Sequence, residues 1–174
     1  MNGRSSTADA AWAFLLDFYR HSGVSEACLV LQDQAGLDVV EMLMLVYADV
    51  VLGKLLPGSE IAALRAETAG WREDVVIPLR AVRRKLKPAR RDIAESAKEA
   101  LRADIKKAEL SAERLQVDFI ADWLERATSG GPALATTLAG LVCEGGPNTH
   151  VKTALGLILT AAQTARRAGP GATP

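Results

Sequence analysis

The sequence predicts an all-α protein: a bundle of six to seven helices with a buried central helix and one long helix that could overhang the rest. Apolar residues recur at three- and four-residue steps along most of the chain, which is the helical period. No alternating apolar and polar run bounded by turn residues predicts a strand. Residues 38–55 are apolar on nearly all sides, as is typical of a helix at the centre of a larger bundle.

Composition limits the class of protein. A chain of 174 residues corresponds to about one domain, and 21 Lys and Arg balance 21 Asp and Glu, so any electrostatic function must come from local clustering. Two distant cysteines, Cys28 and Cys143, make no disulfide framework. Asp17 and Arg20 interrupt the N-terminal apolar run, so we expect no signal peptide and a cytoplasmic location. Charges also interrupt residues 38–55, so no membrane span is expected.

The first third of the chain divides into three predicted helices. The first ends at a His-Ser-Gly turn, and the second, 24–35, stops at Gly36, because glycine readily adopts the left-handed conformation of a C-cap. The central helix, 38–55, begins with Asp38 followed by Glu41. This spacing is that of a capping box, which satisfies the free amides at a helix start.

The sequence predicts three helical segments in the middle of the chain, one of which is interrupted by a proline. Ser59 is positioned to cap a helix that runs to Gly70. The segment 71–87 carries an amphipathic stripe with Pro78 inside it, which predicts a kink or two helices meeting there. Residues 90–127 continue without proline or glycine. A helix of that length is roughly 55 Å long, so its ends should overhang the domain or pair with another chain.

The C-terminal part has small residues and few charges. We therefore divide the chain into a helical core domain, 1–128, and a helical extension, 129–174. The extension predicts a short helix, 133–142, and a longer one, 151–168, capped by Asn148 or Thr149. The last residues are expected to be disordered.

A basic run is the strongest local signal. Its members fall within twelve residues: Arg80, Arg83, Arg84, Lys85, Lys87, Arg90 and Arg91. Such a patch could neutralise phosphates on nucleic acid, an anionic lipid or a nucleotide. No aromatic residues are interleaved for base stacking. The favoured interpretation is a solvated face whose arginines pair with acids on a neighbouring helix.

A smaller charged set suggests a polar pocket. Three arginines, Arg72, Arg80 and Arg83, could share a face of their helix, and Glu109 and Glu113 lie four residues apart on the long helix. Antiparallel packing of the two helices would bring these groups together. They would form either an arginine clamp for an anionic ligand or, as we favour, a ladder of salt bridges.

No catalytic, metal or cofactor site is predicted. The only histidines, His21 and His150, do not follow a glutamate at the spacing that metal-binding bundles use. No serine or cysteine lies in a nucleophile motif. Cys28, in an apolar helix, is expected to pack as a small hydrophobic residue.

Several short strings, in order, resemble a known family. They are Trp12 with Phe14, Gly23-Val24, Ala27-Cys28-Leu29, Leu31-Gln32-Asp33, Gly36-Leu37-Asp38, Trp71-Arg72, Pro78-Leu79-Arg80 with Arg83, Lys107 to Leu110, and Ala112 to Arg114. Over about residues 10–120 the chain resembles an uncharacterised proteobacterial family, domain of unknown function 2390. The resemblance implies a helical bacterial protein and supplies no activity.

These observations leave three functional hypotheses. The leading one is a non-enzymatic module that binds another protein or a second copy of itself through the long helix. The first alternative is a polyanion-binding regulator that uses the basic run, with nucleic acid as one partner. The second is a small-molecule site lined by Arg72, Arg80, Glu109 and Glu113.

Overall fold

The computed structural model describes residues 6–89, 91–142 and 148–168, which form helices and no strand. This confirms the all-α class. In chain order the elements are α1 (Ser6–Arg20), α2 (Val24–Ala35), α3 (Val39–Val50), α4 (Gly58–Trp71), the π-helical segment η1 (Arg72–Val76), α5 (Ile77–Lys85), α6 (Glu95–Arg126), α7 (Leu134–Leu141) and α8 (Thr149–Ala168). Because α4, η1 and α5 are continuous, these elements make seven helical rods, within the predicted number.

The central helix α3 is buried as predicted. Every residue from Val40 to Ala48 is buried, and α3 packs against α1, α2, α6, α7 and α8. The carboxylate of Asp38 accepts hydrogen bonds from the amides of Val40 and Glu41, at 2.9 and 3.2 Å, and so caps the helix. The other half of the predicted capping box is absent, because the Glu41 carboxylate accepts a hydrogen bond from Arg65 at 2.7 Å.

The predicted C-terminal end of the central helix, residue 55, is wrong. Regular helix ends at Val50, and Gly53 follows with a positive φ of 63°. Beyond the helix, the Lys54 ammonium donates to the carbonyl of Leu124 at 2.7 Å. The Lys54 amide donates to the Ala48 carbonyl at 2.8 Å, so a local turn at Gly53 closes the end of α3, and the Lys54 side chain then joins the next segment to α6.

The rod of α4, η1 and α5 differs from the predicted helices. Ser59 caps nothing, since α4 begins at Gly58 without a side-chain cap, and Gly70 lies inside the helix. The irregularity expected at Pro78 appears just before it as η1. There the amide of Ile77 bonds to the carbonyl of Arg72, five residues back. The wider turn accommodates a proline that has no amide and crowds the turn before it.

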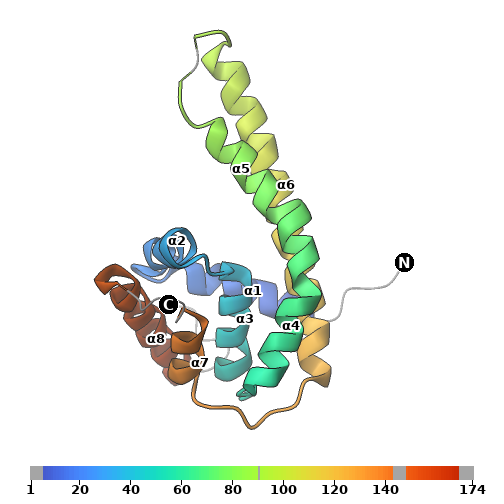
Figure 1. The fold of residues 1–174 in the computed structure, drawn as a ribbon, viewed down its shortest axis with the longest axis vertical. Helices are drawn as coiled ribbons and strands as arrows, with labels where there is room; N and C mark the ends of the chain where they lie inside the picture. The colour runs from blue at the N-terminus through green and yellow to red at the C-terminus, as the bar shows by residue number, and fades with distance from the viewer. Residues whose placement is uncertain (1–5, 90, 143–147, 169–174) are drawn as a thin grey trace.

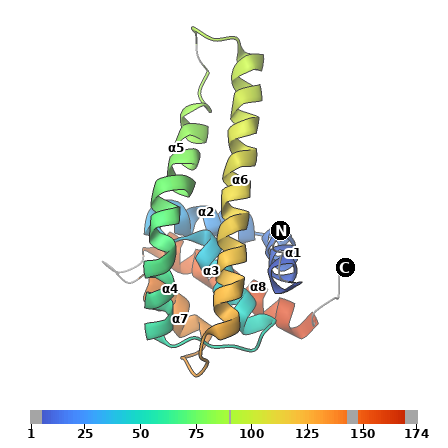
Figure 2. The same ribbon diagram turned by 90° about the vertical axis from the view of Figure 1, so that its right-hand side faces the viewer.

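The long helix α6 lies antiparallel to the α4–α5 rod, and the two rods project from the body as an arm (Figures 1 and 2). Its 32 residues correspond to roughly 48 Å, so the predicted overhang is present. At the tip, the buried Lys98 ammonium donates to the Pro88 carbonyl at 2.9 Å and contacts Glu95 at 2.8 Å. The contact with Pro88 holds the α5–α6 loop against α6.

The C-terminal helices belong to the same core as the rest of the body. Buried residues of α7 and α8, including Leu138 and Ile158, join one hydrophobic cluster with those of α1 to α4 and α6. Asn148 caps α8 by accepting from the Val151 amide at 3.0 Å. The predicted disordered end lies outside the described residues. Within the described ranges, no helix is long and apolar enough to cross a membrane.

Replacing Asp38 with alanine should lower the free energy of unfolding by about 1–2 kcal/mol. Two amides of α3 would lose their acceptor, and Gln116, which donates to Asp38 at 2.8 Å, would lose its partner. Chemical denaturation measures the change. Asp38→Asn is the control, because asparagine retains a capping oxygen. Equal loss in both variants would show that the negative charge matters more than the cap.

Candidate functional site

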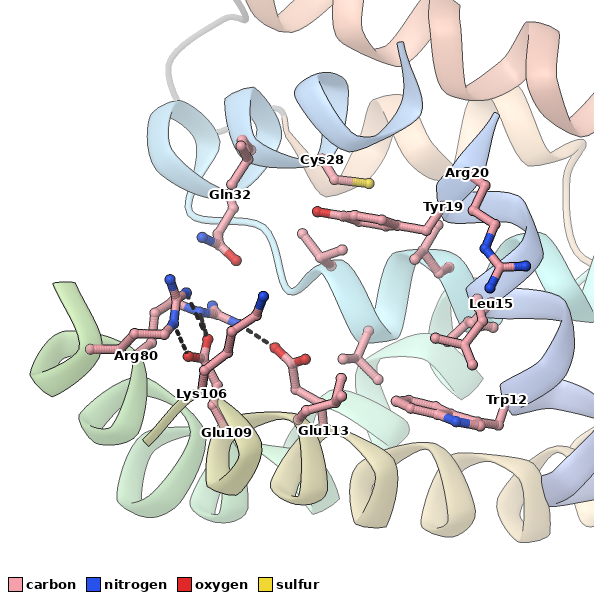
Figure 3. A pocket seen from close by; sticks show the side chains of 17 residues that line it. Trp12, Leu15, Tyr19, Arg20, Cys28, Gln32, Arg80, Lys106, Glu109 and Glu113 are labelled. Carbon is pink, nitrogen blue, oxygen red and sulfur yellow. Dashed lines mark hydrogen bonds and ion pairs between the residues drawn. The ribbon is translucent and has the colours of Figure 1, made fainter. Parts of the chain in front are cut away.

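A cavity of about 530 Å³ lies where the arm leaves the body, between α1, α2, the start of α3 and the helices of the arm (Figure 3). This pocket is lined by Trp12, Leu15, Leu16, Tyr19, Arg20, Cys28, Leu29, Gln32, Val39, Val40, Leu43, Arg80, Arg83, Lys106, Glu109, Leu110 and Glu113. Its volume is within the range of sites for small organic molecules.

Apolar side chains form most of the wall. Helix α1 supplies residues at three- and four-residue steps, which keep them on one side of the helix. Leu16, Leu29 and Leu110 come from three different helices and remain exposed around the pocket. The Trp12 ring also contacts Arg114, whose guanidinium lies 5.3 Å from the ring centre. The pocket therefore has an aromatic wall and an open apolar side.

The polar end of the pocket is built by α5 and α6. Arg80 donates from Nε to Glu109 Oε1 at 2.9 Å and from Nη2 to Glu113 Oε1 at 2.7 Å. Arg83 also contacts both oxygens of Glu109. The two glutamates are four residues apart and so lie on the same side of α6. One arginine thus bridges two carboxylates, and a second arginine shares one of them.

The two carboxylates have opposite electrostatic environments. Burial by itself would raise the pKa of Glu109, but hydrogen bonds from Arg83 and Arg80 outweigh it and lower this pKa below its ordinary value. Burial raises the pKa of Glu113, and its single partner, Arg80, only partly offsets that effect. Glu113 is therefore the carboxylate of this pair that takes up a proton first as the pH falls.

The pocket carries more positive than negative charge. Four cationic side chains line it, against two carboxylates. Arg20 and Lys106 make no ion pair with any residue that the structure describes. Figure 3 shows the Tyr19 hydroxyl, the Gln32 amide and the Lys106 ammonium around the same space. The surplus charge is therefore available to a ligand.

Cys28 also borders this space, and its thiol is inert. Burial raises its pKa to about 12, so the thiol stays protonated at neutral pH. Within the described residues, no group of His, Cys, Asp and Glu is arranged to hold a metal ion.

The structure brings together four of the five residues of the predicted polar pocket. Arg72 is elsewhere: its Nε contacts Asp38 Oδ2 at 3.3 Å and its Nη2 donates to the Gly36 carbonyl at 3.0 Å. The intervening η1 segment changes the helical register between Arg72 and Arg80. Arg72 therefore ties the α2–α3 turn to the arm instead of lining the pocket.

The basic run is divided between several environments. Arg80 and Arg83 belong to the pocket, and Arg84 pairs with Asp33 of α2 at 2.5 Å. Three others, Lys85, Lys87 and Arg91, are exposed near the arm tip and have no ion pair with a described residue. Arg90 lies outside the described residues. The run is therefore not one continuous cationic face.

Sequence reasoning missed the contribution of α1 and α2 to the pocket. Tyr19 and Gln32 reach it only because these helices pack beside the arm. The position of Lys106 beside Glu109 could have been predicted, since it lies three residues before Glu109 and so on the same side of α6.

Comparison with known proteins identifies one match. Residues 10–120 match the family model described as "Protein of unknown function (DUF2390)". All 17 residues that line the pocket lie within that range. No curated protein and no solved structure matches the chain.

Proposed function

The chain belongs to the DUF2390 family of proteins of unknown function, as its sequence indicated, and we propose that it binds a small amphipathic anion in the pocket beside the arm. The observation that carries this proposal is an apolar cavity of about 530 Å³ whose polar end holds more cations than carboxylates. Pockets that combine apolar walls with a few converging polar groups are typical ligand sites.

The apolar wall favours a ligand with a hydrocarbon body. Leu16, Leu29 and Leu110 are exposed to water at the pocket. A ligand that covers them gains roughly 25 cal/mol for each Å² of apolar surface removed from water. The flat Trp12 ring, which has the Arg114 guanidinium 5.3 Å from its centre, offers a further surface for the hydrocarbon part of the ligand.

The charges favour an acidic head group. Glu109 and Glu113 already accept hydrogen bonds from Arg80, so a cationic ligand would compete with that arginine. Lys106 has no ion pair with a described residue, and an acidic head group could pair with it while the bonds of Arg80 remain intact. A carboxylate or phosphate would make the charge-assisted hydrogen bonds that such donors favour.

Isothermal titration with decanoate, decanol and decylamine at neutral pH tests this proposal. We expect decanoate to bind most tightly and decylamine least. Lys106→Glu should weaken decanoate binding at least about tenfold, which is ~1.4 kcal/mol, and leave decanol binding unchanged. The matched control is Lys107→Glu, because Lys107 is exposed and paired with Asp104 outside the pocket.

Three results would contradict the proposal. Absence of binding for all three compounds would remove the pocket as a ligand site. Equal affinity for decanoate and decanol would leave an apolar site and remove the preference for an anion. Equal loss in Lys106→Glu and Lys107→Glu would indicate a diffuse surface effect.

A second candidate function, protein–protein interaction, is favoured by exposed apolar residues along the other side of the arm. Leu101 and Leu115 are each 52% exposed on α6. Polyanion binding through the basic run has less support, since Arg80, Arg83 and Arg84 are already paired with acids.

A further inference from the structure

The arm has a largely apolar face that points away from the pocket. On α6 the apolar residues of this outer flank are Ala97, Leu101, Ala108, Leu115 and Phe119, all exposed, with the polar residues Asp104 and Ser111 between them. They follow one another at steps of four and seven residues, which keep them on one side of the helix. Leu115 lies two residues, or about 200°, from the pocket residue Glu113. The outer flank and the pocket therefore occupy different sides of α6.

Helix α5 extends the outer flank. Val82 is exposed and lies about 200° around the helix from both Arg80 and Arg84, which contact α6 and α2. Arg83 contacts Glu109, so Val82 is close to the level of Ala108 along the arm. The two rods thus present their apolar side chains on the same side.

The outer flank is arranged symmetrically about Ala108. Leu101 and Leu115 lie seven residues on either side of it, and Ala97 and Phe119 lie eleven residues on either side. An antiparallel helix with the same sequence would place its own alanine against Ala108. Leucine would then face leucine, and phenylalanine would face alanine. The small alanines let the two helices approach closely, and each phenylalanine fills the space over an alanine, so the side chains interdigitate.

The charged residues of one arm are also complementary to those of an antiparallel copy of the same arm. Near the tip, Lys85, Lys87 and Arg91 make no ion pair with described residues, and in η1 neither do Glu73 and Asp74. Asp74 is eight residues before Val82, or roughly 12 Å, and Lys87 is five residues after it, roughly 7 Å. An antiparallel copy would bring the cations of each tip close to the acids of the other η1.

We infer that the outer flank binds a second copy of this chain, arm antiparallel to arm, around a two-fold axis at Ala108 and Val82. Leu101 would pack on the partner subunit's Leu115, and Phe119 on the partner subunit's Ala97. A two-fold interface uses the same surface on both subunits, which is what the symmetric spacing and the opposed charges provide. The pocket stays open in this arrangement, because it lies on the other side of each arm.

Site-specific cross-linking tests the register. In a chain with Cys28→Ala and Cys143→Ala, Ala108→Cys treated with a short bismaleimide should give a covalent dimer in high yield, because the two thiols meet at the axis. Leu110→Cys, two residues away and in the pocket, is the matched control and should give little dimer. Circular dichroism confirms that each variant is folded.

Disruption and rescue test the energetics. Ala108→Glu, at an exposed position, should weaken dimerisation at least about tenfold in sedimentation equilibrium, since two carboxylates would meet. The pair Lys85→Glu and Lys87→Glu should also weaken it, and adding Glu73→Lys with Asp74→Lys should restore it. A monomer at every concentration would overturn the inference. A dimer that cross-links through Leu110→Cys and not through Ala108→Cys would overturn it as well.

Discussion

Replacing Gly131 with alanine is expected to lower the free energy of unfolding by about 3 kcal/mol or more. A Cβ at this position would lie 1.9 Å from the Leu56 carbonyl oxygen and 2.2 Å from its carbon. The colliding atoms are backbone, so no side-chain rotation can relieve the contact. The amides of Gly130 and Gly131 both donate to the Leu55 carbonyl, at 2.9 and 2.8 Å, and hold the two segments at this distance.

Thermal and chemical denaturation measure this effect, with Gly70→Ala as the matched control. Gly70 lies inside α4, and a Cβ there meets nothing within 4 Å. Alanine in a helix interior should stabilise the protein by roughly 0.5–1 kcal/mol. If Gly131→Ala were as stable as the wild type, the close packing of the α6–α7 connection on the segment after α3 would be wrong.

Replacing Arg80 with leucine should have the second large effect. We expect it to lower the free energy of unfolding by about 2–3 kcal/mol at neutral pH. Removing one partner of a buried ion pair costs roughly 3–5 kcal/mol, because a charge is left buried and unpaired. The smaller figure applies here because Arg80 and Glu113 retain 14% and 22% exposure. Glu109 also keeps its contacts with Arg83.

The loss should shrink as the pH falls from neutral toward the pKa of Glu113. Burial already raises this pKa, and the charge and hydrogen bond of Arg80 lower it. Without Arg80 it should rise further. A carboxyl whose pKa is raised by folding contributes stability that is present below its unfolded pKa and lost as the pH rises through its folded pKa. Stability curves for wild type and Arg80→Leu should therefore converge in mild acid.

Arg84→Leu is the control for this prediction. Arg84 pairs with Asp33, and both side chains are nearly half exposed. Exposed ion pairs contribute about 0–1 kcal/mol, so little change is expected. Equal losses for Arg80→Leu and Arg84→Leu would show that the buried network contributes no more than a surface pair. A loss independent of pH would contradict the role assigned to Glu113.

The candidate site was only partly accessible to sequence reasoning. Glu109 and Glu113 lie four residues apart, and this local spacing was enough to predict that Arg80 and Arg83 could meet them across two antiparallel helices. The cavity beside them was not predictable, because α1 and α2 close it through packing between segments distant in the chain. The prediction that Arg72 lines the pocket was wrong for a related reason, since η1 changes the helical register between Arg72 and Arg80.

The sequence by itself determined the all-α class, the burial of α3 and the helix ends fixed by local chemistry. Gly36 and Asp38 act through hydrogen bonds to residues within a few positions, so short strings suffice to place them. The early end of α3 at Gly53 is also local, although the apolar pattern continues past it. Only the tertiary structure decided that α4 continues through Gly70 and that α7 and α8 join the core. Those outcomes depend on contacts between residues far apart in the chain, whose free energy outweighs local helix preference.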